Sequence, residues 1–339
     1  MRVLLLLLAL ALGATLPASA QAFTHGRDVP AGTATWMAHG ICSGVLVAPT
    51  RVLTAAHCVG PVAGVVRLGK GPRPVETIPV IGVTVHPRYA NWKDPKASQD
   101  AVAWAGRYDV AILTLARAAR ERPLPPARHS ARPGTRGWGY GFQGSDVAHR
   151  ARQDVLPDAR CRAAFPHGAF DARATLCVGD PGPGSRSRVC GGDSGGPLVA
   201  DGHLIGLVTY GAEILHADCG SGPALAGYAD VGALSDFVLQ PNPAFLPRFS
   251  AIARVVREGG TLRCVPPVFA PGADIRSIAI SWQRRHLRAG RLAPTTLPGR
   301  HADTLPVLAA GEGSQVRCVE RITTAGGPLE QEANWLRVG

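Results

Sequence analysis

The sequence contains no Cys-x-x-Cys pair, the spacing typical of structural zinc sites, and after its first residues it has no apolar run long enough to span a membrane. Lysine is also scarce: Lys70, Lys93 and Lys96 are the only lysines, so arginine carries almost all of the +12 formal charge. These arginines are scattered and are not interleaved with aromatic residues, as a nucleic-acid groove would require. A solvated basic surface is the better interpretation, and no nucleic-acid partner is expected.

The amino terminus has the pattern of an export signal. Met1 and Arg2 precede ten apolar residues, 3–12, which are followed by small residues that include Ala20-Gln21-Ala22. A membrane-spanning helix needs roughly 20 apolar residues, about twice this length, so a membrane anchor is the weaker alternative. The sequence predicts a signal peptide over residues 1–22 and a protein secreted to the periplasm or the cell exterior.

The eight cysteines and the apolar patterning indicate a disulfide-linked all-β protein. Short apolar runs such as 44–48, 109–115 and 204–210 are separated by loops rich in glycine and proline. Runs of this kind are typical of a β-barrel or β-sandwich.

A short helix is predicted over residues 232–239, because Leu234, Phe237 and Val238 have the i, i+3, i+4 spacing of one helical face. Two prolines follow in the segment 240–243, and proline interrupts both helices and central strands. We therefore expect a domain boundary there.

Three segments carry the residue types that cleavage of an unactivated acyl bond requires: a nucleophile, a base, and a group that orients the base. They are Leu53 to Cys58 around His57, Tyr108 to Leu113 around Asp109, and Cys190 to Leu198 around Ser194. Together they resemble the trypsin-like, chymotrypsin-fold serine peptidases, with the family's order of His, Asp, Ser. The similarity extends to His86-Pro87-Arg88-Tyr89 and Gly137-Trp138-Gly139 and covers residues 23–239.

The resemblance implies a double β-barrel and a role for each matching residue. His57 is expected to accept the Ser194 hydroxyl proton, while Asp109 holds the imidazole. The backbone amides of Gly192 and Ser194 are expected to form the oxyanion hole. An α/β-hydrolase is the alternative, but that fold has the order Ser, acid, His and alternates helices with parallel strands, which this sequence does not.

The resemblance also implies disulfides and an activation device. The family's pairings correspond to Cys42 with Cys58, Cys161 with Cys177, and Cys190 with Cys219, which leaves Cys264 and Cys318 for a fourth. Asp193 is expected to bind the free α-amino group of Phe23 in the mature chain. Signal-peptide cleavage after Ala22 would expose that amine directly; the alternative is cleavage after Ala20 and removal of two further residues.

The base of the specificity pocket aligns with Arg188, where trypsin-type enzymes carry an aspartate, so tryptic specificity is not expected. Arg188 recognises an acidic substrate side chain, pairs with a carboxylate such as Glu213, or faces solvent; the sequence leaves these alternatives open. Thr209-Tyr210-Gly211 resembles the segment whose backbone pairs with extended protein or peptide substrates. The stretch 69–78 offers Glu76 but too few oxygen ligands for calcium, and no metal or cofactor is expected.

The C-terminal region resembles an immunoglobulin-like domain. Cys264, Trp282 and Cys318 have the order of a tryptophan packed on an inter-sheet disulfide, although Val316 stands where many such domains carry tyrosine. A generic disulfide-linked β-domain is the alternative, and the region could bind a cell surface or a protein partner. The predicted organisation is a signal peptide at 1–22, a trypsin-like peptidase domain at 23–240, a linker at 241–250 and an immunoglobulin-like domain at 251–339.

Two other functions compete with peptidase activity. One is a catalytically inactive binding protein on the same fold, which the retention of His57, Asp109, Ser194, Gly192 and Asp193 disfavours because folding alone does not need them. The other is an adhesin whose main role lies in the C-terminal region. A serine endopeptidase is the function that the motifs favour.

Overall fold

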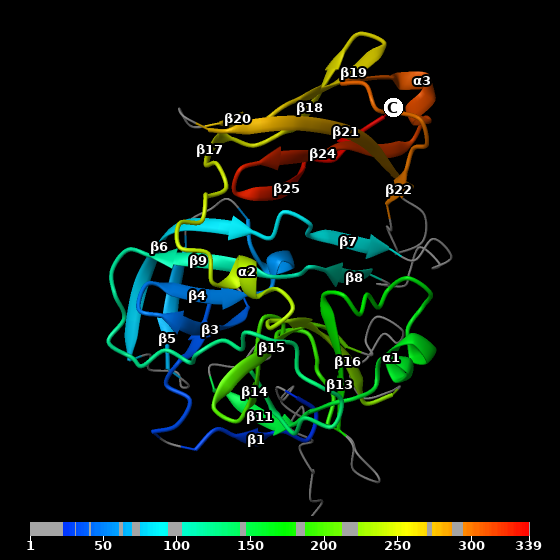
Figure 1. Cartoon of the computed structure of the whole chain (residues 1–339). Coiled ribbons are helices and arrows are strands. Elements are labelled where there is room, and N and C mark those ends of the chain that lie inside the picture. Colours follow the sequence, from blue (N-terminus) through cyan, green and yellow to red (C-terminus); the bar gives the residue numbers. More distant parts are fainter. Residues whose placement is uncertain are drawn as a thin grey trace, which may run out of the picture.

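The computed structural model describes residues 23–338, apart from 31, 41, 61–63, 70–74, 94–103, 143–146, 181–186, 212–222, 270–272 and 287–293. The predicted signal peptide, Glu213 and Cys219 therefore lie outside the described residues. Two barrel-like β-sheets are followed by a further β region at the C-terminus (Figure 1). No helix in the described part of the chain is long and apolar enough to cross a membrane.

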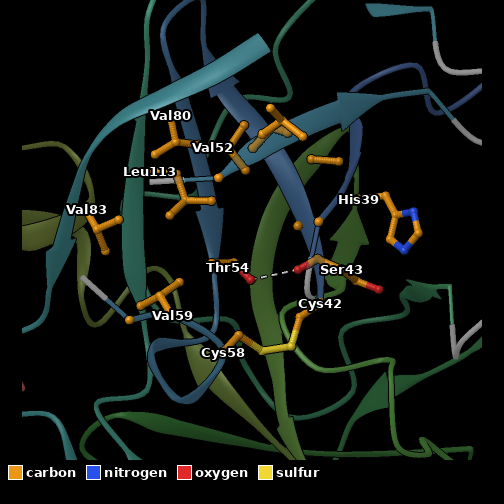
Figure 2. Close-up of a pocket in the computed structure, with 17 residues that line it drawn as sticks. His39, Cys42, Ser43, Val52, Thr54, Cys58, Val59, Val80, Val83 and Leu113 are labelled. Carbon is orange, nitrogen blue, oxygen red and sulfur yellow. Dashed lines mark hydrogen bonds between the residues drawn. A yellow bond between two sulfur atoms is a disulfide. The ribbon is translucent and has the colours of Figure 1, made fainter. Parts of the chain in front are cut away.

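The first sheet is a closed antiparallel barrel. Its strands, in spatial order, are β2 (Met37–His39), β3 (Ser43–Ala48), β4 (Arg51–Thr54), β9 (Ala111–Leu115), β6 (Glu76–Val85) and β5 (Val65–Leu68). Alternate residues of β5 and of the first half of β6 are buried, as expected for strands with one solvated face. Val52, Val80, Val83 and Leu113 line a mainly apolar pocket of about 80 Å³ in this barrel (Figure 2). Beside the barrel, β7 (Ala90–Lys93) and β8 (Trp104–Arg107) pair with each other.

The second sheet has eight strands, all paired antiparallel. In spatial order they are β1 (Arg27–Asp28), β11 (His149–Arg152), β10 (Trp138–Gly141), β14 (Pro197–Ala200), β15 (His203–Tyr210), β16 (Leu225–Asp230), β13 (Thr175–Gly179) and β12 (Asp154–Val155). Helix α1 (Asp158–Ala164) is held to β13 by the Cys161–Cys177 disulfide. Helix α2 (Ser235–Val238) lies within the predicted helix 232–239. The predicted all-β double barrel is confirmed.

The described residues of the C-terminal region form three sheets. They contain β17 (Phe249–Ala251) with β20 (Val268–Phe269); β18 (Arg254–Glu258), β19 (Thr261–Val265) and β23 (Thr304–Pro306); and β22 (Thr295–Thr296), β21 (Ile275–His286), β24 (Ser314–Thr324), β25 (Gly327–Glu332) and β26 (Leu336–Arg337), with α3 (Val307–Ala310) between β23 and β24. The Cys264–Cys318 disulfide joins β19 to β24, and the buried Trp282 lies opposite Cys318 in the β21–β24 register. The immunoglobulin-like assignment and the domain boundaries stay predictions.

The C-terminal region packs directly on the first barrel. The amide of Val85 donates a hydrogen bond of 2.7 Å to the carbonyl of Gly326, in the turn between β24 and β25. Ile322 and Leu329, from these two strands, belong to the same apolar cluster as the barrel core. Gly327 has a φ of +115°, and a Cβ there would lie 2.3 Å from the Val85 carbonyl oxygen, so only glycine permits this approach. The contact places the β24–β25 hairpin beside the His57 segment of the first barrel.

Candidate active site

His57 and Asp109 meet because the strands that carry them are neighbours. His57 lies in a 3-10 turn (Ala56–Cys58) just after β4, and Asp109 lies just before β9, with Thr54 opposite Ala111 in the β4–β9 register. The His57 Nδ1 atom lies 2.6 Å from Asp109 Oδ2, and the His57 amide donates a 2.9 Å hydrogen bond to Asp109 Oδ1. Both carboxylate oxygens therefore fix the position of the histidine.

Asp109 is 1% exposed, and its ionised form is stabilised by its neighbours. Burial alone would raise the pKa of the carboxyl group, but the His57 charge and hydrogen bonds from His57 and Thr209 outweigh burial and lower the pKa below its ordinary value. The Thr209 hydroxyl donates its bond to Asp109 Oδ2 from strand β15. The sequence placed Thr209 only in the substrate-binding segment, and its contact with Asp109 was missed.

Ser194 lies on a tight turn held between the two barrels. Its carbonyl accepts a 3.0 Å hydrogen bond from the Ser43 amide of β3, and the next residue, Gly195, donates through its amide to Val208 of β15. The Ser43 hydroxyl donates to the carbonyl of Gly192 at 3.1 Å. Sequence reasoning missed Ser43, because a lone serine at the start of a strand carries no motif.

Gly195 brings the Ser194 turn against the His57 segment. Its φ is +75°, and a Cβ there would lie 2.3 Å from the Ser43 carbonyl oxygen and from Thr54 Oγ1. The turn thus approaches the backbone that leads into His57.

The backbone of Phe23 reaches Asp193, the residue before Ser194. Its nitrogen lies 3.1 Å from Asp193 Oδ2, and both residues are 0% exposed. The same Asp193 oxygen accepts a 2.9 Å hydrogen bond from the Cys190 amide. One carboxylate oxygen therefore links the backbone of Phe23 to the loop that carries Ser194.

Comparison with known proteins identifies this arrangement. Residues 23–238 match the family model described as Trypsin. The chain is 32% identical over 216 residues to a trypsin of Saccharopolyspora erythraea, covering 59% of this chain and 86% of that protein. It is 30% identical over 211 residues to Homo sapiens kallikrein-8, covering 58% and 75%. A solved structure of neuropsin, a serine protease expressed in the limbic system of mouse brain, aligns over 63% of this chain and 97% of that chain, with a TM-score of 0.52 and 26% identity.

The chain belongs to the trypsin family. This assignment confirms the resemblance drawn from the motifs and the chymotrypsin-like double barrel. The family's members are serine endopeptidases, so the chain is a hydrolase of that class and acts on proteins.

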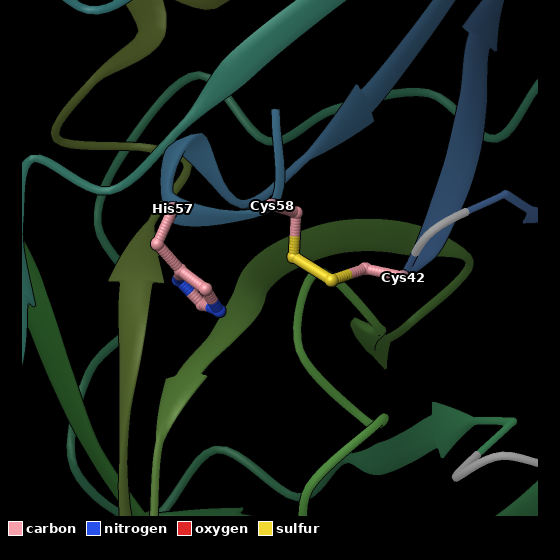
Figure 3. A group of neighbouring side chains, drawn as sticks. All are labelled: Cys42, His57 and Cys58. Atoms are coloured by element: carbon pink, nitrogen blue, oxygen red, sulfur yellow. A yellow bond between two sulfur atoms is a disulfide. The ribbon is translucent and has the colours of Figure 1, made fainter. Parts of the chain in front are cut away.

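The trypsin-family site contains one cluster with the composition of a metal site. Cys42, His57 and Cys58 offer ligand atoms within 4.8 Å of one another. Figure 3 shows that the two sulfur atoms are joined to each other beside the imidazole ring, in the disulfide with an S–S distance of 1.94 Å. Disulfide sulfurs lack the thiolate charge that binds metals, so the cluster fastens the histidine turn to the end of β3.

The structure describes the residues predicted for the specificity pocket, but not all of their expected partners. The backbone of Arg188 pairs with Thr24, whose amide donates to the Arg188 carbonyl at 3.0 Å, and the Arg188 side chain is half-buried. Tyr210 is 2% exposed and its hydroxyl donates to the Ala169 carbonyl at 3.4 Å, while Gly211 follows β15 directly. The expected partner Glu213 and the second cysteine of the Cys190–Cys219 pair lie outside the described residues, so both pairings stay predictions.

Proposed function

We propose that the protein is a secreted serine endopeptidase that uses Ser194, His57 and Asp109 as its catalytic triad. The Ser194 hydroxyl attacks the scissile carbonyl, His57 takes its proton and later protonates the leaving amine, and water then hydrolyses the acyl-enzyme. Asp109 stays ionised and holds the tautomer of His57 that presents Nε2 to the serine. The observation that carries the proposal is the double contact of Asp109 with the His57 ring and amide.

The amides of Gly192 and Ser194 are the proposed oxyanion-hole donors. Among the described residues, none accepts a hydrogen bond from either amide, so both remain available to a substrate oxygen. Gly192 has a φ of 97°, and its carbonyl is held by the Ser43 hydroxyl, which restrains the peptide plane next to the proposed hole. Loss of one such donor typically slows acyl transfer by roughly 100-fold or more.

In the mature enzyme we propose that the free amino group of Phe23 pairs with Asp193. The 3.1 Å distance supports the pairing, and an ammonium group there would face a carboxylate at 0% exposure, where a charged pair is strong. The segment 20–22 matches a signal-peptidase site, so export would release this amine without a further protease. Sequencing the amino terminus of the secreted enzyme tests this: a start at any residue other than Phe23 rejects it.

For substrate preference we propose a pocket that does not select Arg or Lys at the cut, because Arg188 stands at the aligned base. An arginine there repels basic side chains and attracts acidic ones.

The deciding experiment digests an undirected peptide library with the purified mature protein and analyses the products by mass spectrometry. A Ser194→Ala protein, with its fold checked by circular dichroism, is the matched control. Cleavage that disappears in Ser194→Ala is expected. If the folded wild-type protein cleaves nothing, the peptidase proposal fails and the inactive binding protein takes its place; cuts after Arg or Lys would refute the role of Arg188.

A further inference from the structure

A pocket of about 180 Å³ lies where the C-terminal region meets the first barrel, and it adjoins the proposed catalytic histidine. His57 and Val59 line one side, and Leu246, Arg321 and Glu330 line the other. A water molecule takes up roughly 30 Å³ in the liquid, so the pocket has room for an amino-acid side chain. Its position beside His57 puts it within reach of a substrate that occupies the active site.

The far wall of this pocket is held firmly in place. The carbonyls of Gly326 and Val83 accept backbone hydrogen bonds of 2.7 and 2.6 Å from Val85 and Leu246 across the junction. Ile322, behind the wall, and Leu329, which lines it, are 0% and 6% exposed within the barrel's apolar cluster. A wall anchored by backbone hydrogen bonds and by core packing can discriminate between side chains, because its shape does not change when a side chain binds.

The two charged residues of this wall differ in their contacts. Arg321 and Glu330 are exposed and lie opposite each other in the β24–β25 register. The Arg321 guanidinium donates a 3.4 Å hydrogen bond to the carbonyl of Tyr89, which draws it toward the barrel. Among the described residues, none forms a hydrogen bond or an ion pair with the Glu330 carboxylate. The mouth of the pocket thus carries one positive and one negative side chain, and in the described part of the chain only the positive one is held to the barrel by a hydrogen bond.

The Glu330 carboxylate is electrostatically close to the proposed catalytic residues. Burial, and then the negative charges of Asp109 and Glu330, raise the pKa of Tyr89 far above its ordinary value. Tyr89 lines the pocket together with His57 and Glu330. A cationic side chain bound at Glu330 would therefore lie in the same pocket as Tyr89 and His57.

We propose that the C-terminal region supplies a substrate subsite in which Glu330 binds a lysine or arginine side chain flanking the scissile bond. The apolar stem of such a side chain fits against Val59, Leu246 and Leu329, and its cationic end reaches the carboxylate at the rim. This subsite is separate from the primary pocket at Arg188. It rests on the proposed peptidase activity and assigns the C-terminal region a part in recognition.

Charge-reversal variants of the full chain test the subsite. Glu330→Lys should lower, and Arg321→Glu should raise, the ratio of kcat/KM for peptides with lysine to those with glutamate at one flanking position, each on the order of fivefold. Glu312→Lys is the matched control, since it makes the same charge change at an exposed residue at the opposite end of β24 and should leave the ratio unchanged.

A second substrate separates this inference from the proposed function. An acyl amino-acid amide carries a single residue and cannot reach the pocket, so its hydrolysis reports the peptidase chemistry of each variant without the subsite. If Glu330→Lys hydrolyses the amide but its lysine-to-glutamate ratio equals that of the wild type, the subsite is refuted while the peptidase stands. If the ratio moves equally in Glu312→Lys, the effect is the overall charge and the subsite is likewise refuted. No hydrolysis by the wild type would refute both.

Discussion

The two halves of the molecule each bury a carboxyl group, and their surroundings are opposite. Asp109, 1% exposed at the barrel junction, receives hydrogen bonds from His57 and Thr209. Glu320, 0% exposed on β24, has Oε1 3.4 Å from Cys264 Sγ, which is in a disulfide and carries no proton. Its Oε2 atom has no hydrogen-bond partner among the described residues. One acid has several donors around it, and the other has none.

The pKa values of the two acids diverge accordingly. Burial raises the pKa of Glu320 to about 7, whereas the charge of His57 and the hydrogen-bond donors around Asp109 hold its pKa below the ordinary value, although both acids are almost fully buried. Burial therefore does not by itself decide whether an acid is charged; the charges and donors around it do. The same chemical change in the two halves should have opposite consequences.

The largest effect is expected for Asp109→Asn. The amide keeps the size of the side chain but no longer selects the required tautomer of His57, so kcat should fall by about 10⁴-fold. Steady-state kinetics on the best library peptide measures this loss, with unfolding by heat as a check on the fold. A fall of less than tenfold would contradict the role of Asp109.

The next effect tests whether the barrels and the C-terminal region stabilise each other against unfolding. Leu246 is 5% exposed and packs between the barrel and the β24–β25 hairpin, so Leu246→Ala should destabilise the fold by about 2–5 kcal/mol. Scanning calorimetry should show the transitions of both halves moving down together. Leu308→Ala, at a residue 96% exposed, is the control and should change nothing. A shift confined to one half would show that the junction contributes little.

Thr209→Val sharpens the comparison by removing one donor from Asp109. A hydrogen bond to a charged group contributes about 1.5–3 kcal/mol, which corresponds to a loss of roughly 10- to 100-fold in kcat/KM. The pKa of Asp109 should also rise, because the hydroxyl bond is among the contacts that lower it. An NMR titration of the Asp109 carboxyl group measures this rise. Thr209→Ser keeps the donor and should restore both values.

Glu320→Gln should instead stabilise the protein, and only at higher pH. Because the pKa of Glu320 is about 7 in the folded chain and 4.5 ordinarily, the folded state holds a proton that the unfolded state has released. Wild-type stability should therefore fall as pH rises from 4.5 to 7 and then level off. The glutamine variant escapes this loss, gaining about 1–3 kcal/mol at pH 8 and little at pH 4.5. Urea unfolding at both pH values measures it; Glu312→Gln, at an exposed residue, should show no such gain.

Features encoded in a short motif, or in the alternation of buried and exposed residues along a strand, could be predicted from the sequence. The segments around His57, Asp109 and Ser194 are local patterns, so their identity did not depend on knowing the fold. The burial of Glu320 was also accessible: it is two residues beyond Cys318 on one strand and therefore on the same, inward face. That signal was present and was not used.

Other features depend on how distant elements dock. Ser43 and Gly192 are 149 residues apart in the chain, and nothing near Ser43 marks it as a support of the nucleophile turn. The meeting of Val85 with Gly326 likewise follows from the packing of one region on another, which residue periodicity does not specify. The pocket at Glu330 forms only where these two regions pack together, so no short sequence motif predicts it.

The junction at Val85 and Gly326 also bears on how such an enzyme can diversify. It is made by main-chain atoms and buried aliphatic groups, whereas the residues that face the pocket mouth are exposed and carry little of the packing. If the subsite at Glu330 recognises substrate as proposed, substitutions at those exposed positions should alter which proteins are cut and leave the barrel core unchanged. Selection, or an engineer with a small mutant library of the β24–β25 hairpin, can therefore retarget the enzyme without touching the barrels.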